Sequence, residues 1–304
     1  MLTLMALLSI LLCKAIQMVY TPRMICLTGD IHHGSLKINE QSYIPERGDS
    51  EVKIAGRYLQ LVEEFGLKVT FYVTGKTLKQ EWRDFRSISC SPLVEIGGHT
   101  YSGLPRSLLS RWRSRITGVP TVSHAATPGS YGKQMRDTAR MIRIAEKRTG
   151  QRIVSWRSHG LVSDGNTYPI LKRLGIRFIS DDLSWEKYHP ETTPEGLISH
   201  PINVIMDHDH IYHAHRTEDY VKRRKENWSF EADPTRESYG IGEWAEIVED
   251  QVKEIEKAGG VATVLMHPLC MYIADRFETA RRLFKLFSNF TTIWARETEM
   301  YLPR

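Results

Sequence analysis

From residue 24 onward, short runs of apolar residues alternate with longer segments in which apolar residues recur every three or four positions. The short runs are rich in β-branched and aromatic residues, which is typical of strands, whereas the longer spacing is typical of helices that pack one face against a core. The expected strands cover residues 24–29, 68–75, 93–100, 152–160, 176–182, 261–268 and 291–296. The expected helices cover residues 50–65, 134–148, 167–175, 242–260 and 275–288.

This alternation predicts a fold of the α/β class. Strands that are separated by helices pair in parallel through right-handed crossovers. About seven such units follow one another, with no internal repeat, linker or change of composition between them. A chain of 304 residues, 41% of them hydrophobic, can bury one sizeable core. We therefore expect residues 23–304 to form a single (β/α) barrel rather than two domains.

The first 22 residues stand outside this pattern. Their apolar run reaches Lys14 after thirteen residues, which is shorter than the ~20 residues of a bilayer-spanning helix. The run also lacks the preceding positive charge of a secretory signal. Residues 1–22 are therefore a leader, an anchor or the product of a start codon upstream of Met18 or Met24. A leader or an anchor predicts a secreted or membrane-anchored protein, and an upstream start predicts a cytoplasmic one.

The charge of the chain says little about its partners. A net charge of +5 is too small to indicate nucleic acid. Residues 96–136, however, contain no acidic side chain and six basic ones. These are Arg106, Arg111, Arg113, Arg115, Lys133 and Arg136. The segment is either a solvated surface or a region that faces an anionic substrate or a membrane. The four cysteines form no CxxC pair, so we expect core or incidental thiols.

The apolar runs end repeatedly in side chains that can bind metal or transfer protons. These residues are Asp30, His32, His33, His99, Arg157, His159, Asp181, Asp182 and His267. Any one of them has an ordinary structural explanation, such as a buried histidine or an aspartate in a turn. In a parallel barrel, however, active sites lie at the carboxyl ends of the strands, which share one mouth. Five strands that end in this way predict one shared site.

These residue types favour the hydrolysis of an amide or an ester. Imidazole and carboxylate groups suit zinc, iron, cobalt or nickel, and zinc is the ion we expect first. A metal ion with an open position polarises a carbonyl and lowers the pKa of its bound water. A neighbouring carboxylate can accept a proton from the water, and a histidine can protonate the leaving group.

Five motifs, in their order along the chain, resemble the polysaccharide deacetylase family, which is also called the NodB-homology or carbohydrate esterase 4 family. They are LTGDIH, KVTFYVTG, EIGGHTYS, WRSHG and VLMHP. The resemblance runs from about Met24 to about Arg296. It implies an irregular seven-stranded (β/α) barrel of the NodB-homology type. It also implies the metal-dependent removal of an acetyl group from an N-acetylated sugar.

Taken position by position, the resemblance implies roles for the residues at the strand ends. Asp30 falls on the general base, Arg157 on the arginine that orients this base, and His267 on the catalytic acid. Asp181 or Asp182 would be the carboxylate that orients the acid.

The metal motif departs from the family pattern. The family's metal-binding aspartate is replaced by His32, with His33 as an alternate, and its first metal histidine falls on His99. Its second metal histidine falls on Gly103, which cannot bind a metal. Either some of Asp30, His32, His33 and His99 hold the ion in another way, or no metal is bound.

Further residues are candidates for substrate binding. They are His159, which replaces the proline of the fourth motif, with Trp185, His208 and His210. The last two lie in the histidine-rich segment 205–215, which is a substrate-binding loop, a source of metal ligands that repairs the gap at Gly103, or a polar surface segment. Together with the charged stretch that follows, it predicts a loop insertion over about residues 205–240.

Three functions are open on these grounds. The first is a deacetylase that acts on an N-acetylated glycan or glycoconjugate, with an anionic sugar weakly indicated by residues 96–136. The second is a metal-independent, allantoinase-like hydrolase of a small cyclic amide, which the incomplete metal motif favours. The third is a non-catalytic glycan-binding barrel, and the joint presence of Asp30, Arg157 and His267 argues against it. The sequence indicates no nucleic acid or protein partner.

Overall fold

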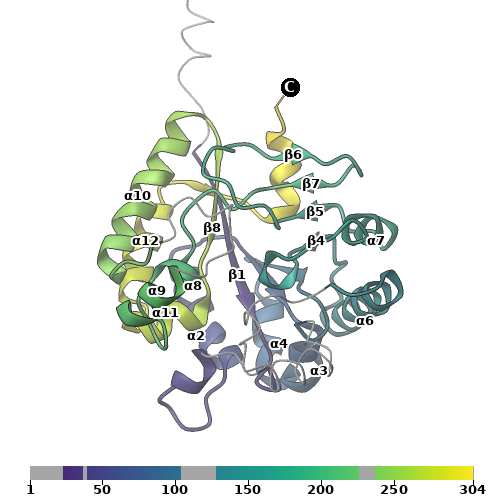
Figure 1. Ribbon diagram of the computed structural model, residues 1–304, viewed down its shortest axis with the longest axis horizontal. Coiled ribbons are helices and arrows are strands. Elements are labelled where there is room, and N and C mark those ends of the chain that lie inside the picture. The colour runs from purple at the N-terminus through teal and green to yellow at the C-terminus, as the bar shows by residue number, and fades with distance from the viewer. Residues whose placement is uncertain (1–22, 37–39, 104–127, 226–236, 304) are drawn as a thin grey trace, which may run out of the picture.

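A single sheet lies at the centre of the protein (Figure 1), whose computed structural model describes residues 23–36, 40–103, 128–225 and 237–303. Nine strands are described: β1 (Met24–Ile31), β2 (Val69–Val73), β3 (Val94–Gly98), β4 (Ser155–Trp156), β5 (Phe178–Ile179), β6 (Glu191–Thr192), β7 (Ile198–Ser199), β8 (Val261–Leu265) and β9 (Thr291–Thr292). Their order is β6-β7-β5-β4-β3-β2-β1-β8, and β9 also pairs with β1. The sheet is therefore an irregular half-barrel, as the α/β pattern predicts.

The strand count differs from the expected seven because of one hairpin. All seven expected strands are present, and β6 and β7 form an additional antiparallel pair at the edge of the sheet. Both residues of β6 are exposed, so this strand has no apolar pattern from which it could be predicted. All other pairs of neighbouring strands are parallel.

Strand β1 is the central strand and positions the site. All eight of its residues are buried. It pairs with β2 on one side and with β8 on the other, so Leu27 lies beside both Val69 and Val264. A strand that is covered on both faces is expected to have a near-continuous apolar sequence, and a polar residue within it requires a partner. Asp30, near the end of β1, is such a residue.

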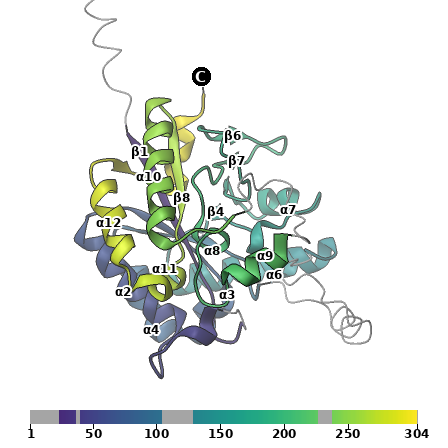
Figure 2. The same ribbon diagram turned by 60° about the vertical axis from the view of Figure 1, so that its left-hand side comes forward.

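Helices cover the sheet on both sides (Figures 1 and 2). They are α2 (Glu51–Glu64), α3 (Gly75–Gln80), α4 (Trp82–Cys90), α6 (Tyr131–Thr149), α7 (Thr167–Arg173), α8 (Asp207–His210), α9 (Glu218–Lys225), α10 (Ile241–Lys257), α11 (Pro268–Asp275) and α12 (Glu278–Phe287). Three 3₁₀ helices are η1 (Glu40–Tyr43), η2 (His159–Leu161) and η3 (Ala295–Tyr301). The expected helices correspond to α2, α6, α7, α10 and α12, and the others are short or lack a clear apolar period.

One large hydrophobic cluster holds these elements together. It extends from Ile25 on β1 to Phe287 on α12 and includes the fully buried Tyr58, Phe71 and Trp244. Figure 2 shows α10 and α12 lying along the side of the sheet that carries β8 and β1. A single core over the described residues agrees with the expectation of one domain.

Several expectations fall on other parts of the chain. Residues 1–22, with the possibilities of a leader, an anchor or an upstream start, lie outside the described residues, and so do Arg106, Arg111, Arg113 and Arg115. In the part of the chain that is described, no helix is both long and apolar enough to cross a bilayer.

Candidate active site

An ion pair between β1 and the end of β4 forms the centre of the site. Arg157 donates from Nη1 to Oδ1 of Asp30 at 2.9 Å. Its other donors reach the Ser180 carbonyl and hydroxyl oxygens and the Thr28 hydroxyl at 2.7–3.1 Å. Burial acts to raise the pKa of Asp30, but Arg157 and His99 outweigh it and hold this pKa well below its usual range. Asp30 is therefore an ionised carboxylate in a fixed orientation.

Three histidines from three strand ends converge beside Asp30. His32 follows β1, His99 follows β3, and His159 lies just beyond β4. Nε2 of His99 lies 3.3 Å from Nε2 of His32 and 3.1 Å from Nδ1 of His159. It also lies 3.7 Å from Oδ2 of Asp30. The shared mouth that the strand ends predict is thus present.

The outer hydrogen bonds of two of these rings determine which nitrogens carry protons. Nδ1 of His99 donates to the carbonyl oxygen of Arg157 at 2.8 Å, and Nδ1 of His32 donates to Oε1 of Glu51 at 2.9 Å. Burial acts to raise the pKa of Glu51, but His32 lowers it overall, so the carboxylate is an acceptor only. In neutral rings, both Nε2 atoms then carry lone pairs that face each other, and a cation between them would relieve their repulsion.

Two of the rings are held in the neutral form. Burial lowers the pKa of His99 to about 4. Burial, followed by the neighbouring His99 and His32, lowers the pKa of His159 well below its usual range. Metal ligands must be unprotonated imidazoles, so burial prepares these rings for a cation before it arrives.

His159 lies close to Gly103, the position at which the family has its second metal histidine. A Cβ atom at Gly103 would lie 3.4 Å from Cε1 of His159 and 3.2 Å from Cδ1 of Leu36. A side chain at position 103 would therefore begin between Leu36 and the His159 ring. His159, which the sequence suggests as a substrate contact, therefore lies with the metal-binding candidates His32 and His99, and it could fill the gap in the metal motif from the end of β4.

The three-histidine group fits a zinc-like ion. Zinc–nitrogen bonds of about 2.0–2.1 Å in a tetrahedron place neighbouring nitrogens about 3.3 Å apart. The two close nitrogen pairs here are separated by 3.3 and 3.1 Å. The bond from His32 to Glu51 is also the carboxylate contact that commonly orients a zinc-bound imidazole. Imidazole ligands accept cobalt, nickel and iron as well, so the group fixes the class of ion and not its identity.

His267 lies on another side of Asp30. Its Nε2 atom is 3.7 Å from Oδ2 of Asp30. Its Nδ1 atom donates to Oδ1 of Asp207 at 2.7 Å, and its backbone N–H donates to Oδ2 of Asp207 at 2.5 Å. Burial opposes protonation of this ring, but Asp207 and Asp30 hold its pKa well above the usual range. Two carboxylates therefore keep the His267 ring charged, and a charged imidazole can donate a proton.

The expectation that Asp181 or Asp182 orients His267 is wrong, because both carboxylates have other partners. Asp181 accepts from the backbone N–H and the hydroxyl of Ser158 at 2.6 and 2.8 Å, so it holds the end of β4 in place. Asp182 accepts from Lys187 at 3.0 Å near the surface. The carboxylate that bonds to His267 is instead Asp207, which follows the short apolar run 204–206, so the same argument from the ends of apolar runs could have found it.

The remaining sequence-predicted residues lie around this centre or away from it. His33 is not part of the three-histidine group, because its ring bonds to the hydroxyl of Thr74 at 2.9 Å. Trp185 packs against the large hydrophobic cluster. His210 bonds through Nδ1 to the carbonyl oxygen of Glu237 at 2.7 Å. His208 approaches the His267 ring, with centroids 5.5 Å apart.

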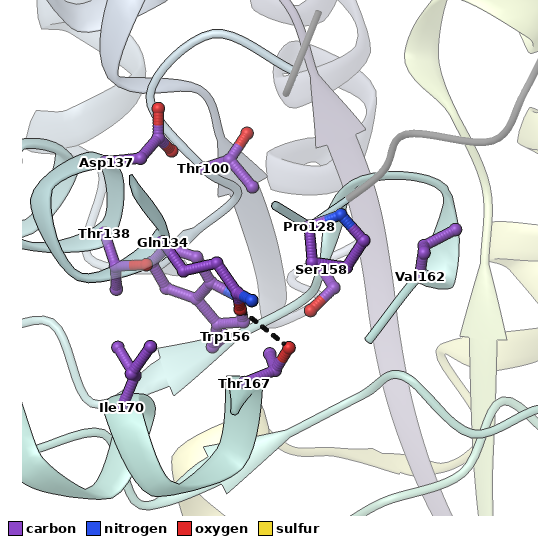
Figure 3. A pocket seen from close by; sticks show the side chains of 10 residues that line it. All are labelled: Thr100, Pro128, Gln134, Asp137, Thr138, Trp156, Ser158, Val162, Thr167 and Ile170. Carbon is purple, nitrogen blue, oxygen red and sulfur yellow. Dashed lines mark hydrogen bonds between the residues drawn. The ribbon is translucent and has the colours of Figure 1, made fainter. Parts of the chain in front are cut away.

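A small cavity lies beside the site, between β4, α6 and α7 (Figure 3). Its volume of about 20 Å³ is enough for about one water molecule. Figure 3 shows Gln134, Trp156, Ser158 and Thr167 among its lining residues, and Thr167 donates to Gln134 at 2.9 Å. None of Asp30, Arg157, His99 and His267 lines this cavity, so it is not the substrate site.

Comparison with known proteins matches part of this chain to a family and most of it to a fold. The family model described as polysaccharide deacetylase matches residues 47–179. A candidate polysaccharide deacetylase from Mycobacterium smegmatis is 16% identical and has a TM-score of 0.61, with 92% of each chain covered. The PuuE allantoinase is 13% identical with a TM-score of 0.59 and covers 94% of this chain and 93% of its own. A candidate polysaccharide deacetylase from Pseudomonas aeruginosa PAO1 is 13% identical with a TM-score of 0.58, and 93% of each chain is covered.

At these identities the solved structures show a shared fold and not a shared substrate. None of the curated protein sequences compared with this chain matches it. The family match covers α2 to β5, which includes His99 and Arg157, and the shared fold extends over more than nine-tenths of the chain. Residues 47–179 therefore match the polysaccharide deacetylase family, as the resemblance of the motifs predicts, and the fold shared with the solved structures continues on both sides of them.

Proposed function

We propose that this protein is a metal-dependent hydrolase that removes an acetyl group from an N-acetylated glycan or glycoconjugate. One observation carries the proposal: three imidazole nitrogens converge beside the Asp30–Arg157 pair, with the protonated His267 near the same carboxylate. The match to the polysaccharide deacetylase family supports a hydrolase of the deacetylase type and a carbohydrate substrate.

His32, His99 and His159 would hold the divalent ion. When bound there, such an ion would polarise the acetyl carbonyl and make water acidic near neutral pH. Asp30 accepts the proton of the attacking water, because Arg157 keeps the carboxylate ionised and pointed into the site. Arg157 acts through Asp30, so it is a positioning residue.

His267 completes the reaction on the leaving side. It donates its Nε2 proton to the amine as the carbon–nitrogen bond breaks, and Asp207 stabilises the charged ring until then. The products are acetate and a free amino sugar. The water supplies the hydroxyl of the acetate and, through Asp30, a proton that balances the one given by His267.

Acetate release tests this function. The full chain is stripped of metal with a chelator, reloaded with zinc, and incubated with a panel of neutral and anionic N-acetylated sugars. We expect release only from the loaded protein, and release about 10²–10⁴-fold slower from a loaded Asp30→Asn variant. Faster release from anionic sugars would support the basic segment 96–136 as their partner.

Two other outcomes would replace the proposal. Opening of a cyclic amide that persists after metal removal would favour the allantoinase-like alternative, for which the PuuE structure is a fold-level precedent only. Binding of glycans without any hydrolysis by the loaded protein would favour a glycan-binding barrel.

A further inference from the structure

A second group of metal-binding side chains lies next to His267 and is not used by the proposed reaction. His208, in α8, His213, shortly after α8, and Cys270, in α11, place one ligand atom each within 4.8 Å of one another. Sγ of Cys270 is 3.7 Å from Nδ1 of His208. The rings of His208 and His213 have their centroids 6.3 Å apart. α8 lies beside α11 in both views (Figures 1 and 2).

The ring of His213 is buried and has one nitrogen that makes no hydrogen bond. Only 7% of the residue is exposed. Its Nδ1 atom donates to the carbonyl oxygen of Ile211 at 2.8 Å, which leaves a lone pair on Nε2. That Nε2 atom is buried and has no hydrogen-bond partner. A buried polar atom without a partner is costly, and a bound ion would remove that cost.

Carboxylates lie near the group, together with the charged ring of His267, whose centroid is 5.5 Å from that of His208. Glu40 is buried and ion-pairs with His215 at 3.0 Å. Burial acts to raise the pKa of Glu40, but His215 and His208 keep it low, so the carboxylate is ionised. Burial, followed by Asp207 and Glu40, raises the pKa of the Cys270 thiol well above its usual range. Burial is the first cause of this shift, and the ionised Glu40 near the group would attract a cation.

A competing set of ligands beside this group is already occupied. Asp207, His267 and Cys270 also approach one another. However, Oδ1 of Asp207 accepts from Nδ1 of His267 and the backbone N–H of His208, and Oδ2 accepts from the backbone N–H of His267. The combination of two imidazoles and the thiol is the one that holds an unpartnered lone pair.

We propose that His208, His213 and Cys270 form a second metal site that takes zinc or a similar thiophilic divalent ion. Two imidazoles and a thiolate are a ligand set that zinc accepts, with a fourth position left for water or a carboxylate. The ion connects residues 207–213 to α11. Because α8 carries Asp207 and His267 caps α11, this connection holds the proton donor against its carboxylate.

Cobalt absorption of the full-length protein tests this site separately from the three-histidine site. The stripped chain is titrated with Co²⁺ and followed in the near ultraviolet, where a sulfur-to-cobalt charge-transfer band reports a thiolate ligand. We expect the band in the unaltered chain and its loss in Cys270→Ser and in His213→Asn. The matched control is Cys90→Ser, which alters an exposed cysteine and should keep the band.

The same titration separates the two sites. His99→Ala should keep the band, since the three-histidine site contains no sulfur, and should lose one of the two equivalents of bound zinc. A chain that shows no band, or a band that disappears in Cys90→Ser and not in Cys270→Ser, would overturn the proposal. If a variant fails to fold, the presence or absence of the charge-transfer band in the unaltered chain still tests the second site. A band without any acetate release would refute the proposed function and leave this site standing.

Discussion

Oδ1 of Asp207 lies 2.7 Å from Nδ1 of His267, although the two residues are separated by sixty positions in the chain. This pair gives His267 its proton at neutral pH, since burial alone would remove it. The first prediction follows from the direction in which the pKa of His267 is shifted. A base whose pKa is raised stays protonated to higher pH, so activity should fall only as the pH rises through that raised value. Asp207→Asn removes the charge, lowers the pKa of His267, and should shift the alkaline limb of kcat/KM to lower pH.

The control for this shift is Asp182→Asn. Asp182 is an alternative acid partner suggested by the sequence, and it pairs with Lys187 near the surface instead. Its pH profile should match that of the unaltered chain. If Asp182→Asn shifted the alkaline limb and Asp207→Asn did not, Asp182 rather than Asp207 would be the carboxylate that keeps His267 protonated.

A second prediction concerns the carboxylate behind the metal ligands. Glu51 accepts from both the ring and the backbone N–H of His32 at 2.9 Å. Outer contacts of this kind typically contribute 10–100-fold to metal affinity. Glu51→Gln should therefore weaken zinc binding by about 10–100-fold, as measured by competition with a chromophoric chelator. Glu63→Gln, an exposed change on the same helix, should leave the affinity unchanged.

A third prediction concerns the ion pair at the centre. Replacing Asp30 by Asn should reduce the rate by about 10²–10⁴-fold, because the base is lost. It should also destabilise the fold, since Arg157 is fully buried and would keep a charge without its counter-ion. Loss of one partner of a buried pair costs about 3–5 kcal/mol, and the amide oxygen that remains should place this variant at the low end. Urea unfolding measures the loss.

The matched change for stability is Asp49→Asn, which breaks a partly exposed pair with Arg57. Exposed pairs contribute about 0–1 kcal/mol, so little stability should be lost. Equal losses of stability in the two variants would mean that the buried ion pair stabilises the fold no more than the exposed one.

Low pH should destabilise the fold in the same way as Asp30→Asn does, because it protonates Asp30. Arg157 lowers the pKa of Asp30 in the folded state, so its stabilisation is present at neutral pH and is lost as the pH falls below about 4.

Most of the fold and the location of the site could be predicted from the sequence, because both depend on local patterns. An apolar run marks a buried strand, and the polar residue that ends the run marks a side chain at the mouth of the barrel. This rule found Asp30, His99, Arg157 and His267. The rule fails for β6, whose two residues are exposed and leave no apolar signal.

The partners of those residues could not be predicted, because they depend on which side chains meet in space. Asp181 follows its strand just as Asp30 lies at the end of β1, yet its carboxylate faces Ser158. His159 stands where the family has a proline, and no local pattern shows that its ring fills the space in front of Gly103. Both facts follow from the positions of neighbouring strands in the sheet.

The relation between His159 and Gly103 yields the last prediction. His159→Ala should release zinc from the three-histidine site, because one of three converging nitrogens is lost. Adding Gly103→His to that variant should restore part of the affinity, since a Cβ atom at position 103 would lie 3.4 Å from the position of the removed His159 ring, provided that Leu36, at 3.2 Å, moves slightly aside. Gly103 has a φ of +74°, so the added residue costs about 1–2 kcal/mol of backbone strain. Zinc titration of both variants measures the recovery, and an affinity no higher in the double variant would show that position 103 does not face the ion.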